Sequence, residues 1–247
     1  MTDKMKNHKL EQRIWVVTGA SRGIGLAIAK HAAANGDKVA LLARGDSVMI
    51  EAERLGDHAI GLGVDVTDCD AVHQACQMVA ERWGRIDVLV NNAGLHRGGL
   101  VQSLPQDDWQ SVIDTNLTGP FNLVRAALPF MGEGGSIVNI GAVVGLRGFA
   151  GDAAYGASKA GLAGLTQVLA MELARKNIRC NLVIPGMIST EMTANISATA
   201  KAKLVKSVPL GREGAPEELA EVVWWVAGSP YMTGAIIPND GGLLCKL

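Results

Sequence analysis

Short apolar runs alternate with helical stretches along almost the whole chain of 247 residues. The apolar runs are rich in Val, Ile and Leu and occupy residues 14–17, 38–42, 59–64, 86–90, 136–140, 179–183 and 235–237. The stretches with a helical pattern lie between them, at residues 26–35, 70–83, 107–131, 155–176 and 216–227. Near-continuous apolar runs indicate strands that are buried on both faces of a parallel sheet. The alternation therefore predicts an α/β fold with a doubly wound parallel sheet and flanking helices.

No linker, repeat or low-complexity segment interrupts this alternation, so we expect one domain over residues 11–247 and a polar tail over residues 1–10. The tail lacks the apolar centre of a signal peptide, and no apolar run is long enough to span a bilayer. The formal net charge of −1 offers nothing to attract nucleic acid or an anionic membrane. We therefore expect a cytoplasmic protein that binds neither.

The cysteines are Cys69, Cys76, Cys180 and Cys245, and they form no CxxC pair and no metal-ligand spacing. Free thiols in a reducing compartment are the simplest interpretation. We expect neither a disulfide framework nor a metal site.

The turn after the first apolar run is the first candidate binding site. Residues 18–25 read Thr-Gly-Ala-Ser-Arg-Gly-Ile-Gly, and a helical pattern begins near Ile24. Glycines permit a tight turn and let the backbone approach a pyrophosphate, while a helix N-terminus offers free N–H groups and the positive end of its dipole. The spacing is Gly-x-x-x-Gly-x-Gly rather than GxGxxG. We interpret it as a dinucleotide loop; the alternative is a glycine-rich turn without a ligand.

The end of the second predicted strand indicates which dinucleotide the chain prefers. An acidic residue there would bind the ribose 2′-hydroxyl of NAD, but the chain reads Leu41-Leu42-Ala43-Arg44, and Asp46 lies beyond the strand end. Arg44 and Arg22 are able to pair with a 2′-phosphate through charge-assisted hydrogen bonds. This pattern favours NADP(H) over NAD(H); the alternative is that both are ordinary surface arginines.

Tyr155 and Lys159 are four residues apart in a predicted helix and therefore share a face. The ordinary pKa of tyrosine, about 10, is high for proton exchange at neutral pH. A neighbouring ammonium stabilises the phenolate, so we expect Lys159 to lower the pKa of Tyr155. Tyr155 would then protonate a carbonyl oxygen as hydride arrives. Taken alone, such a pair more often serves only surface packing.

These segments together resemble the short-chain dehydrogenase/reductase family. Residues 18–25 match TGxxxGxG, residues 91–94 match NNAG, residues 155–159 match YxxxK, and the segment from Pro185 matches the stretch that folds over the nicotinamide. The motifs occur in the family's order, and the similarity covers essentially the whole chain after the first ten residues. The resemblance implies a single-domain Rossmann-like fold and an oxidoreductase, nearest to 3-oxoacyl-acyl-carrier-protein reductases and related ketoreductases.

The resemblance also implies the site residues. For the cofactor they are Gly19, Ser21, Arg22, Gly23, Ile24, Gly25, Arg44, Asp65, Val66, Asn92, Ala93, Gly94, Tyr155, Lys159, Pro185, Gly186, Ile188 and Thr190. The catalytic positions are Asn116, Ala142, Tyr155 and Lys159. Asn116 corresponds to a residue that positions a water at a helix kink, and Asp65 and Val66 would flank the adenine.

Ala142 occupies the position where the family carries its catalytic serine. That serine donates a hydrogen bond to the substrate oxygen, and losing one such donor typically costs roughly 10²–10³ in rate. Neither Gly141 nor Val143 has a side chain to replace it, and Ser136 lies at the wrong end of the strand. Three explanations stay open: an engineered inactive variant, a natural enzyme with a donor from elsewhere, or a cofactor-binding protein without catalysis.

The substrate is the least constrained part of the prediction. We expect its walls to come from His96, Arg97, Arg147, Phe149, Asp152, Met187 and a mobile cover over residues 188–210. His96 taken alone is more often a solvated loop residue. The chain before the fifth predicted strand, residues 131–135, offers no basic residue to an acidic carrier protein, although Arg175 and Lys176 could supply part of a patch.

We therefore expect reduction of a ketone to a secondary alcohol, with the substrate free or bound as an acyl thioester to a carrier protein. By resemblance the chain assembles as a homotetramer. Trp224 and Trp225 serve either that interface or the core, and we expect them in the core. The alternatives are an NAD-dependent alcohol dehydrogenase of the same family and a catalytically silent nucleotide sensor.

Overall fold

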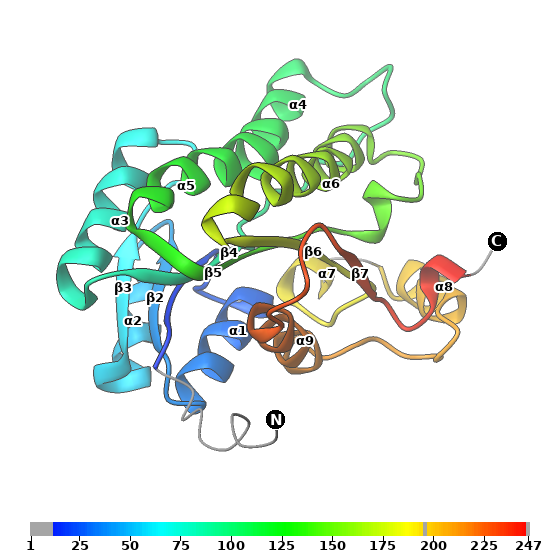
Figure 1. Ribbon diagram of the computed structural model, residues 1–247. Helices are drawn as coiled ribbons and strands as arrows, with labels where there is room; N and C mark the ends of the chain where they lie inside the picture. Colours follow the sequence, from blue (N-terminus) through cyan, green and yellow to red (C-terminus); the bar gives the residue numbers. More distant parts are fainter. Residues whose placement is uncertain (1–11, 195–196, 246–247) are drawn as a thin grey trace.

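A single parallel sheet of seven strands runs through the molecule, in the order β3-β2-β1-β4-β5-β6-β7 (Figure 1). The computed structural model describes residues 12–194 and 197–245. The strands are β1 (Ile14–Thr18), β2 (Lys38–Ala43), β3 (Ala59–Gly63), β4 (Ile86–Asn91), β5 (Met131–Ile140), β6 (Arg179–Pro185) and β7 (Ile236–Asn239). The predicted α/β, Rossmann-like doubly wound fold is confirmed. The tail expected at residues 1–10 lies outside the described residues.

Helices cover both faces of the sheet (Figure 1). One face carries α1 (Gly23–Ala34), α2 (Ser47–Leu55) and α9 (Pro216–Gly228), and the other carries α3 (Cys69–Trp83), α5 (Gly119–Ala127) and α6 (Ala153–Leu173). A further helix, α4 (Gln106–Ile113), packs against α6. Two short helices, α7 (Glu191–Ala194) and α8 (Ala198–Ser207), follow β6 within the predicted cover segment.

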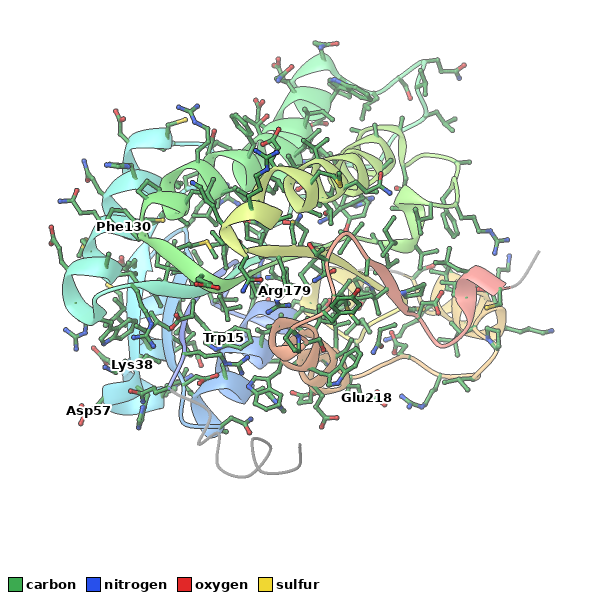
Figure 2. The ribbon with its side chains drawn as sticks, in the orientation of Figure 1. Trp15, Lys38, Asp57, Phe130, Arg179 and Glu218 are labelled. Atoms are coloured by element: carbon green, nitrogen blue, oxygen red, sulfur yellow. The ribbon has the colours of Figure 1, made fainter. Side chains whose placement is uncertain are left out.

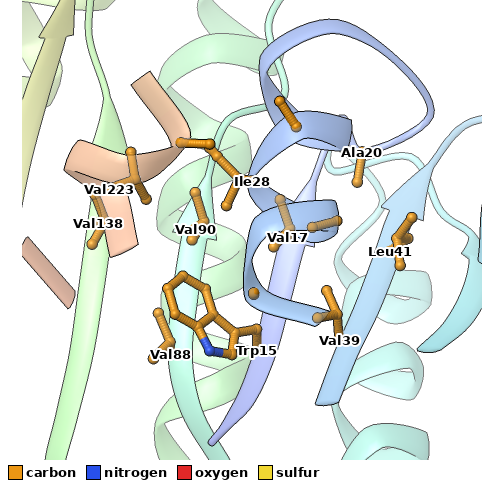
Figure 3. Close-up of a cluster of buried hydrophobic side chains, with 14 of the residues drawn as sticks. Trp15, Val17, Ala20, Ile28, Val39, Leu41, Val88, Val90, Val138 and Val223 are labelled. Carbon is orange, nitrogen blue, oxygen red and sulfur yellow. The ribbon is translucent and has the colours of Figure 1, made fainter. Parts of the chain in front are cut away.

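The two cores follow from the alternation of side chains along each strand. In β1, Trp15 and Val17 point to the α1 and α9 face, where they are fully buried (Figure 3). Ile14 and Val16 point to the opposite face and pack with residues of α3 and α5. Both faces of the strand are therefore dry, which explains why its sequence is apolar without interruption.

The prediction of one continuous helix over residues 107–131 is wrong, because the helix is interrupted and also ends before Met131. After α4, residues Asp114–Thr118 form a π-helical turn, and the α-helix resumes as α5 and ends at Ala127. A 3-10 turn at Leu128–Phe130 follows, because Pro129 at its centre has no N–H with which to continue the helix. Met131 already belongs to β5, which is longer than predicted.

Two further differences come from weak or misleading hydrophobic patterns. The sequence did not predict α2, of whose residues only Val48 and Ala52 are buried. The expectation that Trp225 lies in the core is wrong, because its side chain is 57% exposed on α9. Trp224 is partly buried and packs against the core.

All four cysteines are free thiols. No helix in the described part of the chain is both long and apolar enough to cross a membrane.

Buried charges at the opposite end of the sheet from the candidate site have defined partners. Arg179, at the start of β6, donates to the carbonyl oxygens of Val226 and Ala227 at 3.3 and 2.6 Å, at the C-terminal turn of α9 (Figure 2). These carbonyls are the negative end of the helix dipole, so the guanidinium satisfies them and ties α9 to the sheet.

Asp37, which precedes β2, is 5% exposed and accepts hydrogen bonds from three parts of its surroundings. The donors are the backbone N–H and guanidinium of Arg13, at 2.9 to 3.2 Å, and the indole Nε1–H of Trp15, at 2.8 Å. Removing the carboxylate leaves a half-buried cation and a buried N–H group without their acceptor.

We predict that Asp37→Ala lowers the free energy of unfolding by about 3–5 kcal/mol, the range for breaking a buried ion pair. Urea denaturation followed by circular dichroism measures the change. The matched control is Asp108→Ala, which removes an exposed carboxylate 3.6 Å from Arg97 and should cost about 1 kcal/mol or less. Equal losses in the two variants would contradict this account of Asp37.

Candidate active site

A cleft of about 390 Å³ opens at the carboxyl edge of the sheet, where the strand order reverses between β1 and β4. Ligands of open α/β sheets bind at such a reversal, because the turns after the two strands diverge there. The turn after β1 contributes Gly19 and Ser21, the turn after β4 contributes Asn92 and Ala93, and Tyr155 of α6 also lines the cleft. The sheet topology thus brings together segments that are far apart in the chain.

The glycines of the first turn are required by close packing. Gly19 has φ of +63°, in the left-handed region, and a Cβ there would lie 2.9 Å from the Cα of Ala93. A Cβ on Gly25 would lie 2.4 Å from the carbonyl oxygen of Gly19. A side chain at Gly19 would collide with the turn after β4, and a side chain at Gly25 would push the start of α1 away from the first turn.

Hydrogen bonds from Thr18 join the two turns. Its Oγ1 donates to the carbonyl oxygen of Val90 at 3.2 Å and accepts from the N–H groups of Asn92 and Ala93, both at 3.0 Å. The side-chain amide of Asn92 donates in return to the carbonyl oxygen of Thr18 at 2.9 Å. The two lips of the cleft are therefore fixed relative to each other.

The donors at the mouth of the cleft fit an anionic ligand such as a pyrophosphate. Helix α1 begins at Gly23, directly behind the cleft wall, and its first turn contains no acidic residue. Within the described chain the N-cap residue, Arg22, provides no side-chain acceptor for the first N–H groups. These N–H groups and the positive end of the helix dipole are thus available to phosphate oxygens.

The outer end of the cleft carries two exposed arginines. Arg44 follows β2, has a 70% exposed side chain and lies 3.9 Å from Asp65 Oδ2. Arg22 donates to Glu191 of α7 at 2.8 Å. Exposed ion pairs of this kind contribute little stability, so both guanidinium groups are free to exchange their partner for a phosphate.

Asp65 is held as a carboxylate. Partial burial alone would raise its pKa, but the N–H and hydroxyl of Thr67, each hydrogen-bonded to Oδ1, and the charge of Arg44 lower the pKa below its ordinary value. A negative charge therefore stands beside Arg44 at the outer end of the cleft.

Tyr155 and Lys159 lie on the cleft face of α6, as their spacing predicts. The ammonium of Lys159 is buried, donates to the carbonyl oxygen of Ile140 at 2.8 Å and lies 5.7 Å from the centre of the Tyr155 ring. Burial lowers the pKa of Lys159 to about 8. Burial and the charge of Asp152 raise the pKa of Tyr155 to about 12. The expectation that Lys159 lowers the pKa of Tyr155 is therefore wrong for the protein alone.

Asn116 lies in the π-helical turn and is fully buried. Its Oδ1 accepts from the N–H of Leu95 at 2.7 Å, and its Nδ2 donates to the carbonyl oxygen of Leu95 at 2.9 Å and to Ser158 Oγ at 3.1 Å. The side chain thereby fastens the chain after β4 to α6, close to Tyr155.

Most of the predicted residues meet at the cleft. Those that line it are Gly19, Ser21, Arg22, Gly23, Ile24, Arg44, Asp65, Val66, Asn92, Ala93, Gly94, Tyr155, Lys159, Pro185 and Thr190. Gly25, Asn116 and Ala142 are not among the residues that line the cleft, and Gly186 and Ile188 line a separate hollow of about 80 Å³. Ile188 is 5% exposed and forms a β-bridge with Gly214.

The candidate substrate residues divide into two groups. His96 and Asp152 lie beside Tyr155, with His96 Nε2 2.8 Å from Asp152 Oδ1. Arg97 pairs instead with Asp108 of α4, and Arg147 donates to the carbonyl oxygen of Leu243 near the chain end. Ala142 follows β5 in an extended conformation and presents only a methyl group.

Other residues of the cleft were not identified from the sequence. They are Leu42, Ala43, Ser47, Val64, Thr115, Ile140, Gly141, Glu191 and Met192. Ser47 is the first residue of α2 and follows the end of β2 by four residues. If this helix start had been recognised from the sequence, the Ser47 hydroxyl would have been placed at the outer end of the cleft. In residues 12–194 and 197–245 no group of three or more His, Cys, Asp or Glu side chains is arranged to hold a metal ion.

Comparisons with known proteins agree with this geometry. Residues 19–244 match a family model described as Enoyl-(Acyl carrier protein) reductase. The chain is 41% identical over 244 residues to the 3-oxoacyl-(acyl-carrier-protein) reductase FabG of Thermotoga maritima, with 96% of this chain and 99% of that protein covered.

Two solved structures extend the likeness to the fold. A blue fluorescent protein from a metagenomic library, in complex with NADPH, is 34% identical with a TM-score of 0.88, and 94% of this chain and 97% of that chain are covered. A short-chain dehydrogenase/reductase of Serratia marcescens is also 34% identical, with a TM-score of 0.89 and coverage of 96% and 100%. Because sequence and fold agree over almost its whole length, this chain belongs to the short-chain dehydrogenase/reductase family.

Proposed function

We propose that the protein reduces a ketone to a secondary alcohol with NADP(H), and that Tyr155 donates the proton. The observation that carries the proposal is the position of Tyr155 and the buried Lys159 in a cleft that is also lined by the glycine turn and by Asn92. A proton donor, a cation and a dinucleotide-sized channel in one place are the parts that hydride transfer to a carbonyl requires.

The cleft residues divide the binding of a dinucleotide among them. We assign the pyrophosphate to Gly19, Ser21, Gly23 and Ile24, a 2′-phosphate to Arg22 and Arg44, the adenine to Asp65 and Val66, and the nicotinamide half to Asn92, Ala93, Gly94, Lys159, Pro185 and Thr190. Gly186 and Ile188, which line the separate hollow, are assigned only to supporting the segment between Pro185 and Thr190. When bound, the nicotinamide supplies the hydride. The complex of a relative of similar fold with NADPH supports the choice of phosphorylated dinucleotide.

The protonation states suit donation by Tyr155. With a pKa near 12 the phenol keeps its proton at neutral pH and has one to give when negative charge develops on a carbonyl oxygen. With a pKa near 8 the buried Lys159 is mostly charged at neutral pH and stabilises the phenolate that forms. We assign the ordering of a water near this pair to Asn116, which lies in the π-helical turn.

The substrate we propose is a 3-oxoacyl thioester or a related ketone, because the Thermotoga maritima relative is named for reducing 3-oxoacyl groups on a carrier protein. The chain at the start of β5 offers Glu133 rather than basic residues to an acidic carrier, so a free thioester or small ketone fits equally. Exposed apolar side chains on α5, α6 and α9, including Phe121, Met171 and Trp225, support assembly as a homotetramer.

Tyr155→Phe tests the proton donor. We expect kcat for NADPH-dependent ketone reduction to fall about 10²–10⁴-fold, the usual contribution of a positioned acid, while the dissociation constant of NADPH stays within about threefold. Stopped-flow oxidation of NADPH and fluorescence titration measure the two quantities. A variant as active as the parent would remove Tyr155 from the mechanism.

Arg44→Ala tests the cofactor preference. We expect the dissociation constant of NADPH to rise about 10–100-fold, because a hydrogen bond to a charged group contributes about 1.5–3 kcal/mol, and that of NADH to change little. Tight binding of NADH by the parent without a preference for NADPH would contradict the assignment and favour the NAD-dependent alternative.

Lys159→Met tests the buried cation in the protein without cofactor. The pKa of Lys159 is lowered in the folded state, from 10.5 to about 8, so between pH 8 and 10.5 the unfolded chain binds more protons than the folded protein. The free energy of unfolding therefore rises with pH in this range. We expect the free energy of unfolding to rise from pH 8 to 10 by about 2 kcal/mol more in the parent than in Lys159→Met. Parallel pH dependences would show that the ammonium is solvated.

A further inference from the structure

The proposed reaction leaves one requirement unmet at the position of Ala142. Negative charge develops on the carbonyl oxygen, and a methyl group there donates nothing. Three nearby donors already serve the protein's own acceptors: Lys159 Nζ bonds the carbonyl oxygen of Ile140, Asn116 Nδ2 bonds that of Leu95, and Ser158 Oγ bonds that of Tyr155. Lys159 has two further N–H donors, but the proposed function assigns Lys159 to the nicotinamide half of the cofactor. We therefore look for a second donor beside Tyr155 on another element.

The imidazole of His96 lies against the Tyr155 ring. The ring centres are 5.1 Å apart and the planes meet at 87°, an edge-to-face contact. The imidazole is also close to Gly98, where an added Cβ would lie 3.4 Å from His96 Cε1. A side chain that is 40% exposed is thus held between the loop backbone and the tyrosine.

The carboxylate of Asp152 holds this imidazole in place instead of capping helix α6. It is the N-cap residue of α6, yet in the described chain its carboxylate makes no capping hydrogen bond and lies 2.8 Å from His96 Nε2 instead. The two loops are also joined through the backbone, where Gly99 N–H donates to the carbonyl oxygen of Gly151 at 2.8 Å. The pair is therefore part of a built connection between loops and differs from an isolated surface ion pair.

The bond to Asp152 determines which proton His96 can offer. A carboxylate only accepts, so Nε2 carries the proton that faces it. The other ring nitrogen, Nδ1, is a donor only when the ring carries both protons, so a hydrogen bond from Nδ1 to a substrate oxygen requires that form of His96.

We propose that His96, oriented by Asp152, donates to the substrate oxygen the hydrogen bond that Ala142 cannot give. The inference rests on the proposed ketone reduction and deepens it. Tyr155 still transfers the proton, and His96 keeps its own, so no additional group is consumed. The chain is then an active enzyme with a relocated donor rather than a disabled one.

A double-mutant cycle between positions 96 and 142 tests the inference. His96→Phe preserves the aromatic packing on Tyr155 and removes both nitrogens. We expect it to lower kcat about 100-fold with a much smaller change in KM, since one donor to a developing oxyanion contributes roughly 10²–10³ in rate. Ala142→Ser should raise kcat less than about threefold in the parent and at least about tenfold in His96→Phe.

Two further variants separate the donor from its support. Asp152→Asn keeps an acceptor for Nε2 but removes the charge, and we expect an intermediate loss of kcat. His31→Phe is the matched control, because His31 makes a similar edge contact with Trp224 at 5.9 Å, away from the cleft. It should leave kcat unchanged. NADPH affinity by fluorescence titration and thermal unfolding should be the same for the parent and all variants.

The outcomes distinguish this inference from the proposed function. Activity of His96→Phe within about threefold of the parent, or an effect of His96→Phe that is the same with and without Ala142→Ser, would overturn the role of His96. A rise of about 100-fold on Ala142→Ser with His96 intact would also overturn it, while leaving ketone reduction established. Absence of ketone reduction in both the parent and Ala142→Ser would instead overturn the proposed function.

Discussion

The hydrogen bonds of a single hydroxyl, that of Thr18, hold the candidate site together. They join the turn after β1 to the turn after β4 at the place where the winding of the sheet reverses. Without this hydroxyl the two turns would keep only the bonds from the Asn92 side-chain amide to the carbonyl oxygens of Thr18 and Gly19, in addition to the backbone ladder and the packed cores of the sheet. The lack of space for any Cβ at Gly19 and Gly25 follows from the same close approach.

The chemistry of the cleft is set mainly by burial. Removing Lys159 from water lowers its pKa, and removing Tyr155 from water raises its pKa, so two groups with similar ordinary values move apart in opposite directions. The tyrosine is a protonated donor and the lysine is close to releasing its charge. The packing of α6 against β6 supplies this burial, which shifts the pKa values of both groups in opposite directions.

The features that the sequence predicted are local ones. Each strand shows its burial on both faces in its own residues, and the glycine turn and the Tyr155–Lys159 spacing are each readable within one short segment. The pairing of His96 with Asp152 joins positions 56 residues apart, so only the folded backbone brings them together. Helix α2 and the exposure of Trp225 depend on neighbours in the same way. The sequence indicates His96 and Asp152 separately as candidate substrate residues, but it does not predict that they pair.

The π-helical turn at Asp114–Thr118 accommodates one more residue than an α-helical turn of the same rise. The N–H of Gly119 accordingly bonds the carbonyl oxygen of Asp114, five residues back instead of four. Asn116 lies inside this widened turn, and its amide bonds outside the helix to Leu95 and Ser158. The irregular turn is thus also the place where this helical segment is fastened to two other parts of the chain.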